Sequence, residues 1–325
     1  MALKLSVLDQ SVACVGRGQD ESIRNTVALA EHCEALGYNR FWLSEHHSLP
    51  TIVGTAPEVL MAAIAARTQR IRIGSAGVML PHYSPFKVAE QFRVLDALAP
   101  GRIDLGVGRA PGSDQRTALL LNPDPRSSQH FPQQVAQLSA WISGEAVAEG
   151  VQALPMSGTK PDLWMLGSSG YGAQLAGHFG MPYAFAHFIT DGEGTKEALD
   201  LYRHTFKPGL IEKPHATVCV WALAADTEEQ AWHLFASRER ARVNRQRGQF
   251  GPLLPPDEAR GGYTASEQAY VDDLRRKAMV GTGPQVLAKL QALADDLGID
   301  EVVVITWTWD PAAQRRSYEL LAKAV

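Results

Sequence analysis

The chain has 325 residues, of which 45% are hydrophobic and 20% charged, and its formal net charge is −4. This composition is typical of a globular protein, and the length suits one large α/β domain or two smaller ones. The mild acidic balance argues against nucleic acid as the main partner, because binding to phosphate backbones requires clustered Lys and Arg. The arginines between positions 238 and 247 alternate with helix-forming residues, so we expect them on a solvated helix face.

The three cysteines, Cys14, Cys33 and Cys219, are far apart and form neither a metal-binding knuckle nor a CxxC redox pair. This usage predicts a reduced protein of the cytoplasm. The N-terminus lacks a basic region followed by a long apolar core, and no segment approaches about 18 uncharged apolar residues. We therefore expect neither secretion nor a membrane partner.

Short apolar runs alternate with helical patterns along the first third of the chain. The runs at 3–8, 40–43, 71–76 and 103–108 are predicted strands. Apolar residues at helical spacing predict helices at 21–36, 56–68 and 86–98. Gly37 follows the first of these as a stop signal, and Pro57 lies near the first turn of the second.

The alternation is interrupted twice in the rest of the chain. Residues 123–161 are irregular apart from a predicted helix at 135–142, and residues 248–262, with three Pro and four Gly, break the pattern again. Around these interruptions, strands are predicted at 163–166, 183–186, 217–224 and 301–305. Helices are predicted at 171–179, 195–206, 227–247, 284–297 and 311–323.

Eight strands separated by helices predict a (β/α)8 TIM barrel, with insertions after strands 4 and 7. A doubly wound sheet is the alternative, but no strand leads into the Gly-x-Gly-x-x-Gly fingerprint. Gly106, Gly108 and Gly112 have the wrong spacing for it. Without an internal repeat or a low-complexity linker, we expect a single domain over residues 1–325.

The stretch FWLSEHH at 41–47 runs from an apolar strand directly into a carboxylate and two imidazoles. Residues at the C-terminal end of such a strand open into the crevice where α/β folds build their sites. Adjacent histidines on a strand point to opposite faces, so His46 and His47 cannot easily bind one metal ion. We expect no metal site; one imidazole enters the cavity and the other supports its wall.

A second set of strand ends suggests a bound anion. Gly167, Ser168, Ser169 and Gly170 form a turn without bulk at the start of a predicted helix, where free N–H groups attract anions. Arg109, at the end of the neighbouring strand, could bind the same anion with two hydrogen bonds. The small residues at 75–78 allow a flat ligand to approach the backbone, although ordinary packing beneath a loop is the favoured explanation of this feature by itself.

These stretches together resemble the bacterial luciferase-like flavin-dependent monooxygenases, in particular the subgroup of luciferase-like class oxidoreductases. Residues 41–47 are similar to the second-strand motif of that family, and residues 71–85 to its third strand and following loop. PGRIDLGVGRAPG at 100–112 resembles the fourth-strand signature, and LGSSGY at 166–171 the phosphate loop. The resemblance covers most of the chain.

The resemblance implies a TIM barrel that binds reduced FMN, often supplied by a separate flavin reductase, and a homodimer. By position, Arg109 and the turn from Gly167 to Tyr171 (Gly167, Ser168, Ser169, Gly170 and Tyr171) would bind the FMN phosphate. Ala76 and Gly77 match the place of a non-prolyl cis peptide behind the isoalloxazine ring. Glu90 matches a carboxylate near the flavin, and His46 the catalytic histidine, a candidate general base.

The implied activity is that of a monooxygenase acting on paired donors with incorporation of O2. Reduced FMN and O2 would form a flavin C4a-hydroperoxide that oxidises a small organic substrate. The protein would supply a dry pocket and an imidazole titrating near neutrality. Residues 248–283 match the mobile loop of luciferase, either as a lid or as a disordered insertion. Two other functions stay open: hydride transfer with the deazaflavin F420, and flavin binding without turnover.

Overall fold

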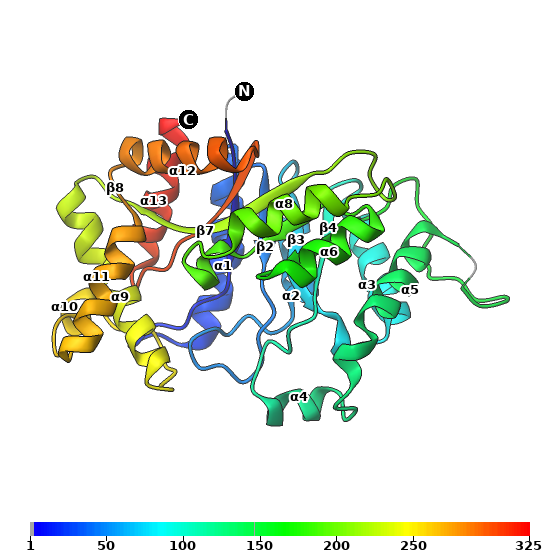
Figure 1. Cartoon of the computed structure of the whole chain (residues 1–325), viewed down its shortest axis with the longest axis horizontal. Helices are drawn as coiled ribbons and strands as arrows, with labels where there is room; N and C mark the ends of the chain where they lie inside the picture. Colours follow the sequence, from blue (N-terminus) through cyan, green and yellow to red (C-terminus); the bar gives the residue numbers. More distant parts are fainter. Residues whose placement is uncertain (1–2, 146) are drawn as a thin grey trace.

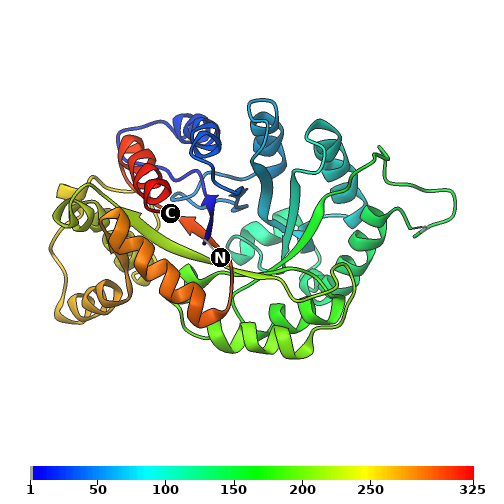
Figure 2. The ribbon, with the colours of Figure 1, turned by 90° about the horizontal axis from the view of Figure 1, so that it is seen from above.

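The computed structural model describes residues 3–145 and 147–325, which form a closed parallel barrel surrounded by helices (Figures 1 and 2). The strands are β1 (Lys4–Asp9), β2 (Arg40–Leu43), β3 (Arg72–Met79), β4 (Ile103–Gly108), β5 (Asp162–Gly167), β6 (Tyr183–Phe185), β7 (Ala216–Ala224), β8 (Met279–Gly281) and β9 (Glu301–Ile305).

The helices in the first half are α1 (Gln19–Ala35), α2 (Pro57–Ala65), η1 (Leu80–His82), α3 (Pro85–Leu98), α4 (Gln115–Leu121), η2 (Ser127–His130) and α5 (Phe131–Ser143). Those in the second half are α6 (Gly170–Phe179), α7 (His187–Thr190), α8 (Thr195–Thr205), α9 (Glu228–Gln246), α10 (Pro256–Ala259), α11 (Ala265–Lys277), α12 (Gly283–Leu297) and α13 (Pro311–Ala324). None of the helices in the described residues combines the length and apolarity needed to span a membrane.

The barrel closes through eight of these strands, the eight predicted from the sequence. Each of β1 to β6 pairs in parallel with the next, β6 pairs with β7, β7 with β9, and β9 returns to β1. The TIM-barrel prediction is therefore confirmed. A ninth strand, β8, is only three residues long and extends the C-terminal end of β7, where Ala222–Ala224 pair with Met279–Gly281.

The strands are buried on both faces, as expected for a parallel barrel. Along β7, Val218 and Val220 face the helices and join the main core, whereas Cys219 and Trp221 face the lumen and join a second apolar cluster. This period of two fixes which side chains enter the barrel. On β2, Trp42 points inward and packs edge-on against Trp164 of β5, with ring centroids 5.1 Å apart.

Both predicted insertions are present, but the expectation of loop was partly wrong. The insertion after β4 contains α4, η2 and α5, and the insertion after β7 contains α10, α11 and β8 as well as α9. Residues 248–283, expected to be a lid or a disordered insertion, thus include regular structure (yellow to orange in Figure 1). The start of α11 is fixed by a capping box, in which the Thr264 hydroxyl and the Glu267 carboxylate bind each other's backbone N–H groups.

Candidate active site

The parallel strands bring their C-terminal ends to one rim of the barrel, the end at which TIM-barrel proteins build their sites. The stretch after β2 crosses this rim between β1 and β3. The backbone N–H of His46 donates to the carbonyl of Gly54 at 3.1 Å, and that of His47 to the carbonyl of Gly112 at 3.0 Å. These bonds hold the stretch in one position against the loops after β2 and β4.

Glu45 and His47 lie on the same side of this stretch and form a buried network. Glu45 is 1% exposed, and its Oε1 lies 2.7 Å from His47 Nε2 and accepts a hydrogen bond of 2.7 Å from the Tyr83 hydroxyl. Its Oε2 accepts from the backbone N–H of Met79 at 3.0 Å. A carboxylate that accepts hydrogen bonds from three donors is held in one position, and it links the residues after β2 to the end of β3.

His46 lies on the opposite side, with the lumen-facing residues of β2. Its Nδ1 is 3.2 Å from Ser44 Oγ. The pKa of its ring is influenced by burial first, and also by the positive charge of Arg245 at the end of α9, which lowers it. Burial lowers the pKa of His46 to about 4, which outweighs the opposite effect of Glu45. The expectation of an imidazole titrating near neutrality was therefore wrong: His46 is neutral at pH 7 because its surroundings disfavour the charged ring.

Arg109 and the Gly-Ser turn lie together because β4 and β5 are neighbours in the barrel. The Arg109 guanidinium stacks on the Tyr171 ring, 4.0 Å from its centroid, and neither Arg109 nor Ser168 and Ser169 are buried. Ser169 precedes α6 without making a side-chain cap, so the first N–H groups of this helix have no intrahelical or side-chain acceptor. Among described residues, Arg109 has no acidic partner within ion-pair distance.

The bond between Ala76 and Gly77 is a non-prolyl cis peptide, at the position that the resemblance implied. The pairing of β3 with β4 shifts register here, so that Gly77 is left out of the ladder between Ala76 and Val78. A Cβ atom on Gly77 would collide with the Leu166 side chain and lie 2.7 Å from the Gly106 carbonyl oxygen. Only glycine fits this close crossing of β3, β4 and β5.

In the described residues, no hydrogen bond or ion pair links Glu90 to the residues at the strand ends. It lies on α3, and its Oε2 is 3.4 Å from Nζ of Lys87 one turn away. The predicted place of Glu90 near a flavin rests on the resemblance alone.

The rim contains further polar residues that sequence reasoning missed. Trp307, after β9, donates its Nε1 hydrogen to Oε1 of the buried Gln10, after β1, at 3.1 Å. On α9, Arg238 is 5% exposed, and Arg242 forms an ion pair with Asp191. The expectation that these arginines lie on a solvated helix face was wrong for Arg238, because α9 packs against the C-terminal half of β7 and is covered by α10 and α11. Arg238 lies at helical spacing from the buried Ala231 and Phe235, and this periodicity was the signal that could have placed it on the packed face of α9.

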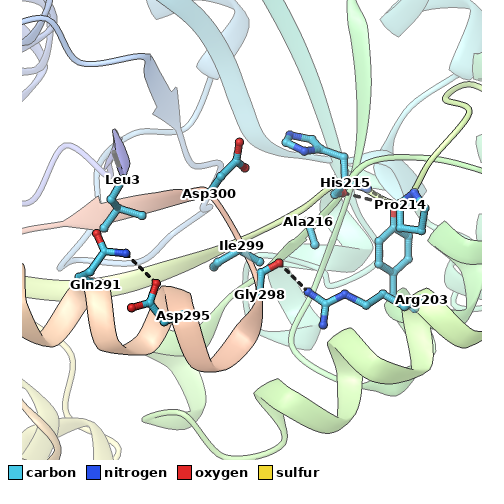
Figure 3. A pocket seen from close by; sticks show the side chains of 11 residues that line it. Leu3, Arg203, Pro214, His215, Ala216, Gln291, Asp295, Gly298, Ile299 and Asp300 are labelled. Atoms are coloured by element: carbon cyan, nitrogen blue, oxygen red, sulfur yellow. Dashed lines mark hydrogen bonds between the residues drawn. The ribbon is translucent and has the colours of Figure 1, made fainter. Parts of the chain in front are cut away.

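A cavity of about 350 Å³ lies at the opposite, N-terminal end of the barrel, between α8 and α12 (Figure 3). It is lined by residues that precede β7 and β9, including His215 and Asp300. Arg203 points across it and donates to the carbonyl of Gly298 at 3.1 Å. Its charged groups thus have protein partners, and the end of the barrel it occupies normally serves stability.

The fold and the polar residues at its rim define a TIM-barrel protein whose candidate site lies at the C-terminal ends of its strands. In residues 3–145 and 147–325, no group of three His, Cys, Asp or Glu side chains could hold a metal ion. The family model of the luciferase-like monooxygenases matches residues 3–301. The chain belongs to this family, which supports an oxidoreductase of the monooxygenase type.

Two relatives illustrate the range of similarity. A luciferase-like monooxygenase of Escherichia coli (strain K12) is 40% identical over 322 residues, covering 98% of this chain and 96% of the relative. The N-acetyl-S-alkylcysteine monooxygenase of Bacillus subtilis (strain 168) is 34% identical over 330 residues, covering 99% of this chain and 98% of the relative.

Solved structures share the fold. Apo-MsnO8 matches with a TM-score of 0.90 and 36% identity over 99% of this chain and 98% of that chain. The oxygenating constituent of 3,6-diketocamphane monooxygenase of Pseudomonas putida, solved with FMN, matches with a TM-score of 0.72 and 19% identity, covering 100% and 98%. An F420-dependent secondary alcohol dehydrogenase matches with a TM-score of 0.67 and 16% identity, covering 100% and 98%. Members of this fold therefore include flavin- and F420-binding proteins.

Proposed function

We propose that the chain is an FMN-dependent monooxygenase that uses reduced FMN and O2 to oxidise a small organic substrate. The observation that carries this proposal is the open N-terminus of α6 beside Arg109. Free N–H groups, exposed serines and an unpaired guanidinium fit a phosphate group, and a phosphate there would lie at the rim of the barrel. Family membership supports flavin as the group that carries the phosphate.

The residues present fit a flavin in two ways. Arg109 and the turn of Gly167, Ser168, Ser169, Gly170 and Tyr171 would hold the phosphate. The small residues of β3 and β4 leave a wall of backbone against which a flat ring can lie, because Gly108 bears no side chain and a Cβ there would have only the Met79 sulfur nearby, at 3.8 Å. When bound and reduced, FMN would supply the oxygen-activating chemistry of the reaction.

The protein's own contribution would be positioning and proton control. His46, neutral and half-buried, can accept a proton at the ring nitrogen that faces the lumen while Ser44 holds Nδ1. A low pKa makes it a weak base in the resting protein, so its proton uptake would follow the appearance of negative charge near it. The network of Glu45, His47 and Tyr83 keeps the backbone on either side of His46 in place.

Several finer properties remain proposals. We expect reduced FMN to be delivered by a separate flavin reductase and the protein to act in the cytoplasm as a homodimer. Large apolar side chains exposed on the adjacent helices α2 and α3, at Val59, Val94 and Leu98, support a self-association surface. Sedimentation at micromolar concentration would test the dimer, and a monomer under those conditions would contradict it.

The decisive experiment titrates the apo-protein with FMN, reduced FMN and F420, and then measures oxygen uptake with candidate substrates. The substrate named by the B. subtilis relative supports small thioethers as the first compounds to test. We expect binding of reduced FMN and substrate-dependent oxygen uptake with an oxygenated product. Tight F420 binding with indifference to FMN would support hydride transfer instead. Flavin binding without oxygenation of any substrate would leave a binding protein.

A further inference from the structure

Arg238 is a buried guanidinium whose charge is poorly matched by the protein. It is 5% exposed, and its closest acidic atom is Oδ1 of Asp191, 3.7 Å away, which is longer than a hydrogen bond. The same carboxylate forms a closer ion pair with Arg242. Two guanidinium groups thus share one carboxylate, and a net positive charge is left in the interior.

The other neighbours of Arg238 do not supply the missing charge. The guanidinium stacks over the Trp221 ring, 4.4 Å from its centroid, and lies 5.7 Å from that of Phe235. The Tyr270 hydroxyl accepts a hydrogen bond of 2.9 Å from Arg242, and burial lowers the pKa of His187, which faces Arg238, so that this imidazole is neutral at pH 7. Glu239, next to Arg238 on α9, is bound by Arg275. An isolated buried charge is costly, so the missing negative charge beside Arg238 points to a partner outside the protein.

The position of Arg238 is at the lumen rather than at the outer surface. Trp221, on which it stacks, belongs to the apolar cluster of the barrel interior that also includes Ala76, Leu166 and Trp307. The indole nitrogen of Trp221 is buried and has no hydrogen-bond partner in the described residues. A guanidinium that shares its one carboxylate and an indole N–H without a partner in the described residues therefore occur side by side, on the β7 side of the candidate site.

We propose that Arg238 binds an anionic group of the organic substrate, most simply a carboxylate, and so selects acidic substrates. This assignment rests on the proposed oxidation of a small organic molecule at this rim. A carboxylate has two oxygens in the geometry of the guanidinium fork, and it would neutralise the surplus charge beside Asp191 and Arg242. The aromatic wall of Trp221 and Phe235 would exclude water from the contact and strengthen it.

The flavin phosphate is a less suitable partner for Arg238. Arg109 and the open N-terminus of α6 already form an anion site at the ends of β4 and β5. Arg238 lies instead over β7, which is separated from β5 by β6 in the barrel. Two anion sites on different strands would orient two ligands, the cofactor by its phosphate and the substrate by its acid group.

The test compares carboxylates with their neutral amides as probes. FMN-loaded protein is titrated with acetate, hexanoate, benzoate and N-acetyl-S-methylcysteine, and with the matching primary amides, by calorimetry and tryptophan fluorescence. We expect at least one acid to bind about tenfold or more tightly than its amide, as a charge-assisted hydrogen bond requires. Arg238→Met, which keeps the contact with Trp221, should remove this preference, and Arg238→Lys should retain part of it.

The control variant is Arg240→Met on the same helix, whose guanidinium binds the backbone carbonyls of Ala259 and Gly261 rather than the lumen. It should leave the preference unchanged. If Arg238→Met does not fold, Asp191→Asn provides the second test, because loss of the competing carboxylate should tighten binding of the acid; unchanged or weaker binding would contradict the proposal.

Three outcomes would overturn the assignment: no acid is preferred over its amide, the preference survives in Arg238→Met, or this variant loses FMN affinity more than Arg109→Ala does. The last result would place the cofactor phosphate at Arg238. Failure of the wild-type protein to bind FMN at all would count against the proposed function instead. The acid titrations would then be read on the protein without FMN, so the two failures can be distinguished.

Discussion

His46 and its neighbours show how three adjacent polar residues acquire different environments. Glu45 and His47 point away from the lumen and bind each other, whereas His46 points inward and its Nδ1 lies 3.2 Å from Ser44 Oγ. The alternation of side chains along an extended chain separates them. The orientation of His46 could thus be predicted from the sequence, but its pKa could not, because it depends on how far tertiary packing removes the ring from water.

The low pKa of His46 has a consequence for stability. The unfolded chain binds a proton near pH 6.5 that the folded protein binds only near pH 4. The free energy of unfolding should therefore rise with pH between these values and level off above 6.5, by up to about 3 kcal/mol from this residue. His46→Gln should remove this part of the slope. Urea unfolding of both proteins at pH 5 and pH 7.5 checks it, and parallel pH dependences would show that His46 is not the source.

Arg109 should contribute to cofactor affinity rather than to stability, because it is exposed and has no acidic partner in the described part of the chain. Arg109→Ala should weaken FMN binding by roughly 1.5–3 kcal/mol if the guanidinium contacts the phosphate. Riboflavin, which lacks the phosphate, should bind equally to both proteins. Arg116→Ala, an exposed arginine on α4, serves as the matched control. Equal FMN affinity in Arg109→Ala would refute the contact.

His46 should affect turnover and not flavin affinity. We expect His46→Ala to lower the rate of substrate oxygenation at saturating reduced FMN while the dissociation constant of FMN stays within about twofold, since a role in proton transfer typically contributes ~100-fold or more to rate. Stopped-flow turnover and flavin titration measure the two quantities separately. Unchanged turnover would remove His46 from the reaction.

At the scale of elements, the segment between α9 and β8 is attached to loops at the rim of the barrel. Leu253 donates its N–H to the carbonyl of Ala13 and accepts from the N–H of Val15, while the Thr51 hydroxyl binds the carbonyl of Gly251 at 2.7 Å. These bonds join the segment to the loops after β1 and β2, and the Ser237 hydroxyl of α9 donates to the carbonyl of Leu254 at 2.7 Å. Figure 1 shows α10 and α11 against α9, next to β8.

Leu253 should therefore act as a core residue despite its position in a Gly- and Pro-rich stretch. It is 1% exposed, so Leu253→Ala should lower the free energy of unfolding by about 2–5 kcal/mol. The neighbouring Leu254, which is only half-buried, provides the control, and its replacement by Ala should cost less. A cost for Leu253→Ala below about 0.5 kcal/mol, the usual range for surface changes, would mean that the segment moves as a lid independent of the barrel.

The elements that were predicted from the sequence differ from those that were missed in how many apolar side chains they bury. The eight barrel strands are buried on both faces, so each appears as a short, mostly apolar run. In contrast, α4 has no buried residue, and α11 buries only Val271 and Leu274. Their apolar periodicity is too weak to predict a helix. The Thr264 and Glu267 capping box before α11 was a usable signal that the surrounding Gly and Pro obscured.

The candidate site was predictable to a similar degree. The neighbouring positions of Arg109 and Tyr171 follow from the order of the strands, and chain order gives that directly. The burial of Arg238 depends on the packing of α9 against β7 and on Asp191, which is 47 positions away along the chain, and no local pattern encodes such a contact. Glu90, placed by resemblance only, has no contact in the structure that supports or opposes its role.

At the scale of the whole molecule, the two ends of the barrel differ in how well their charges are matched. At the C-terminal rim, Arg109 has no acidic partner among the described residues, and Arg238 shares Asp191 with Arg242. At the N-terminal end, the charged side chains are paired. Arg40 donates from Nε to Glu301 at 2.9 Å and from Nη1 to Asp104 at 2.8 Å, and Asp104 also accepts from Trp42 Nε1 at 2.8 Å. This layer joins strands β2, β4 and β9 and closes the floor of the barrel.

Arg40 should consequently be needed for stability and not for the site. Arg40→Met would leave the buried Glu301 without its cation, whereas Asp104 would keep its ion pair with Arg72, and breaking a buried ion pair in this way costs about 3–5 kcal/mol. Urea unfolding measures the loss, with Arg24→Met, from an exposed pair with Asp20, as the control. Wherever the variant is folded, its FMN affinity should match that of the wild type, since the floor lies at the opposite end of the strands from Arg109. A loss of FMN affinity in folded Arg40→Met would show instead that the floor and the rim are coupled through the barrel.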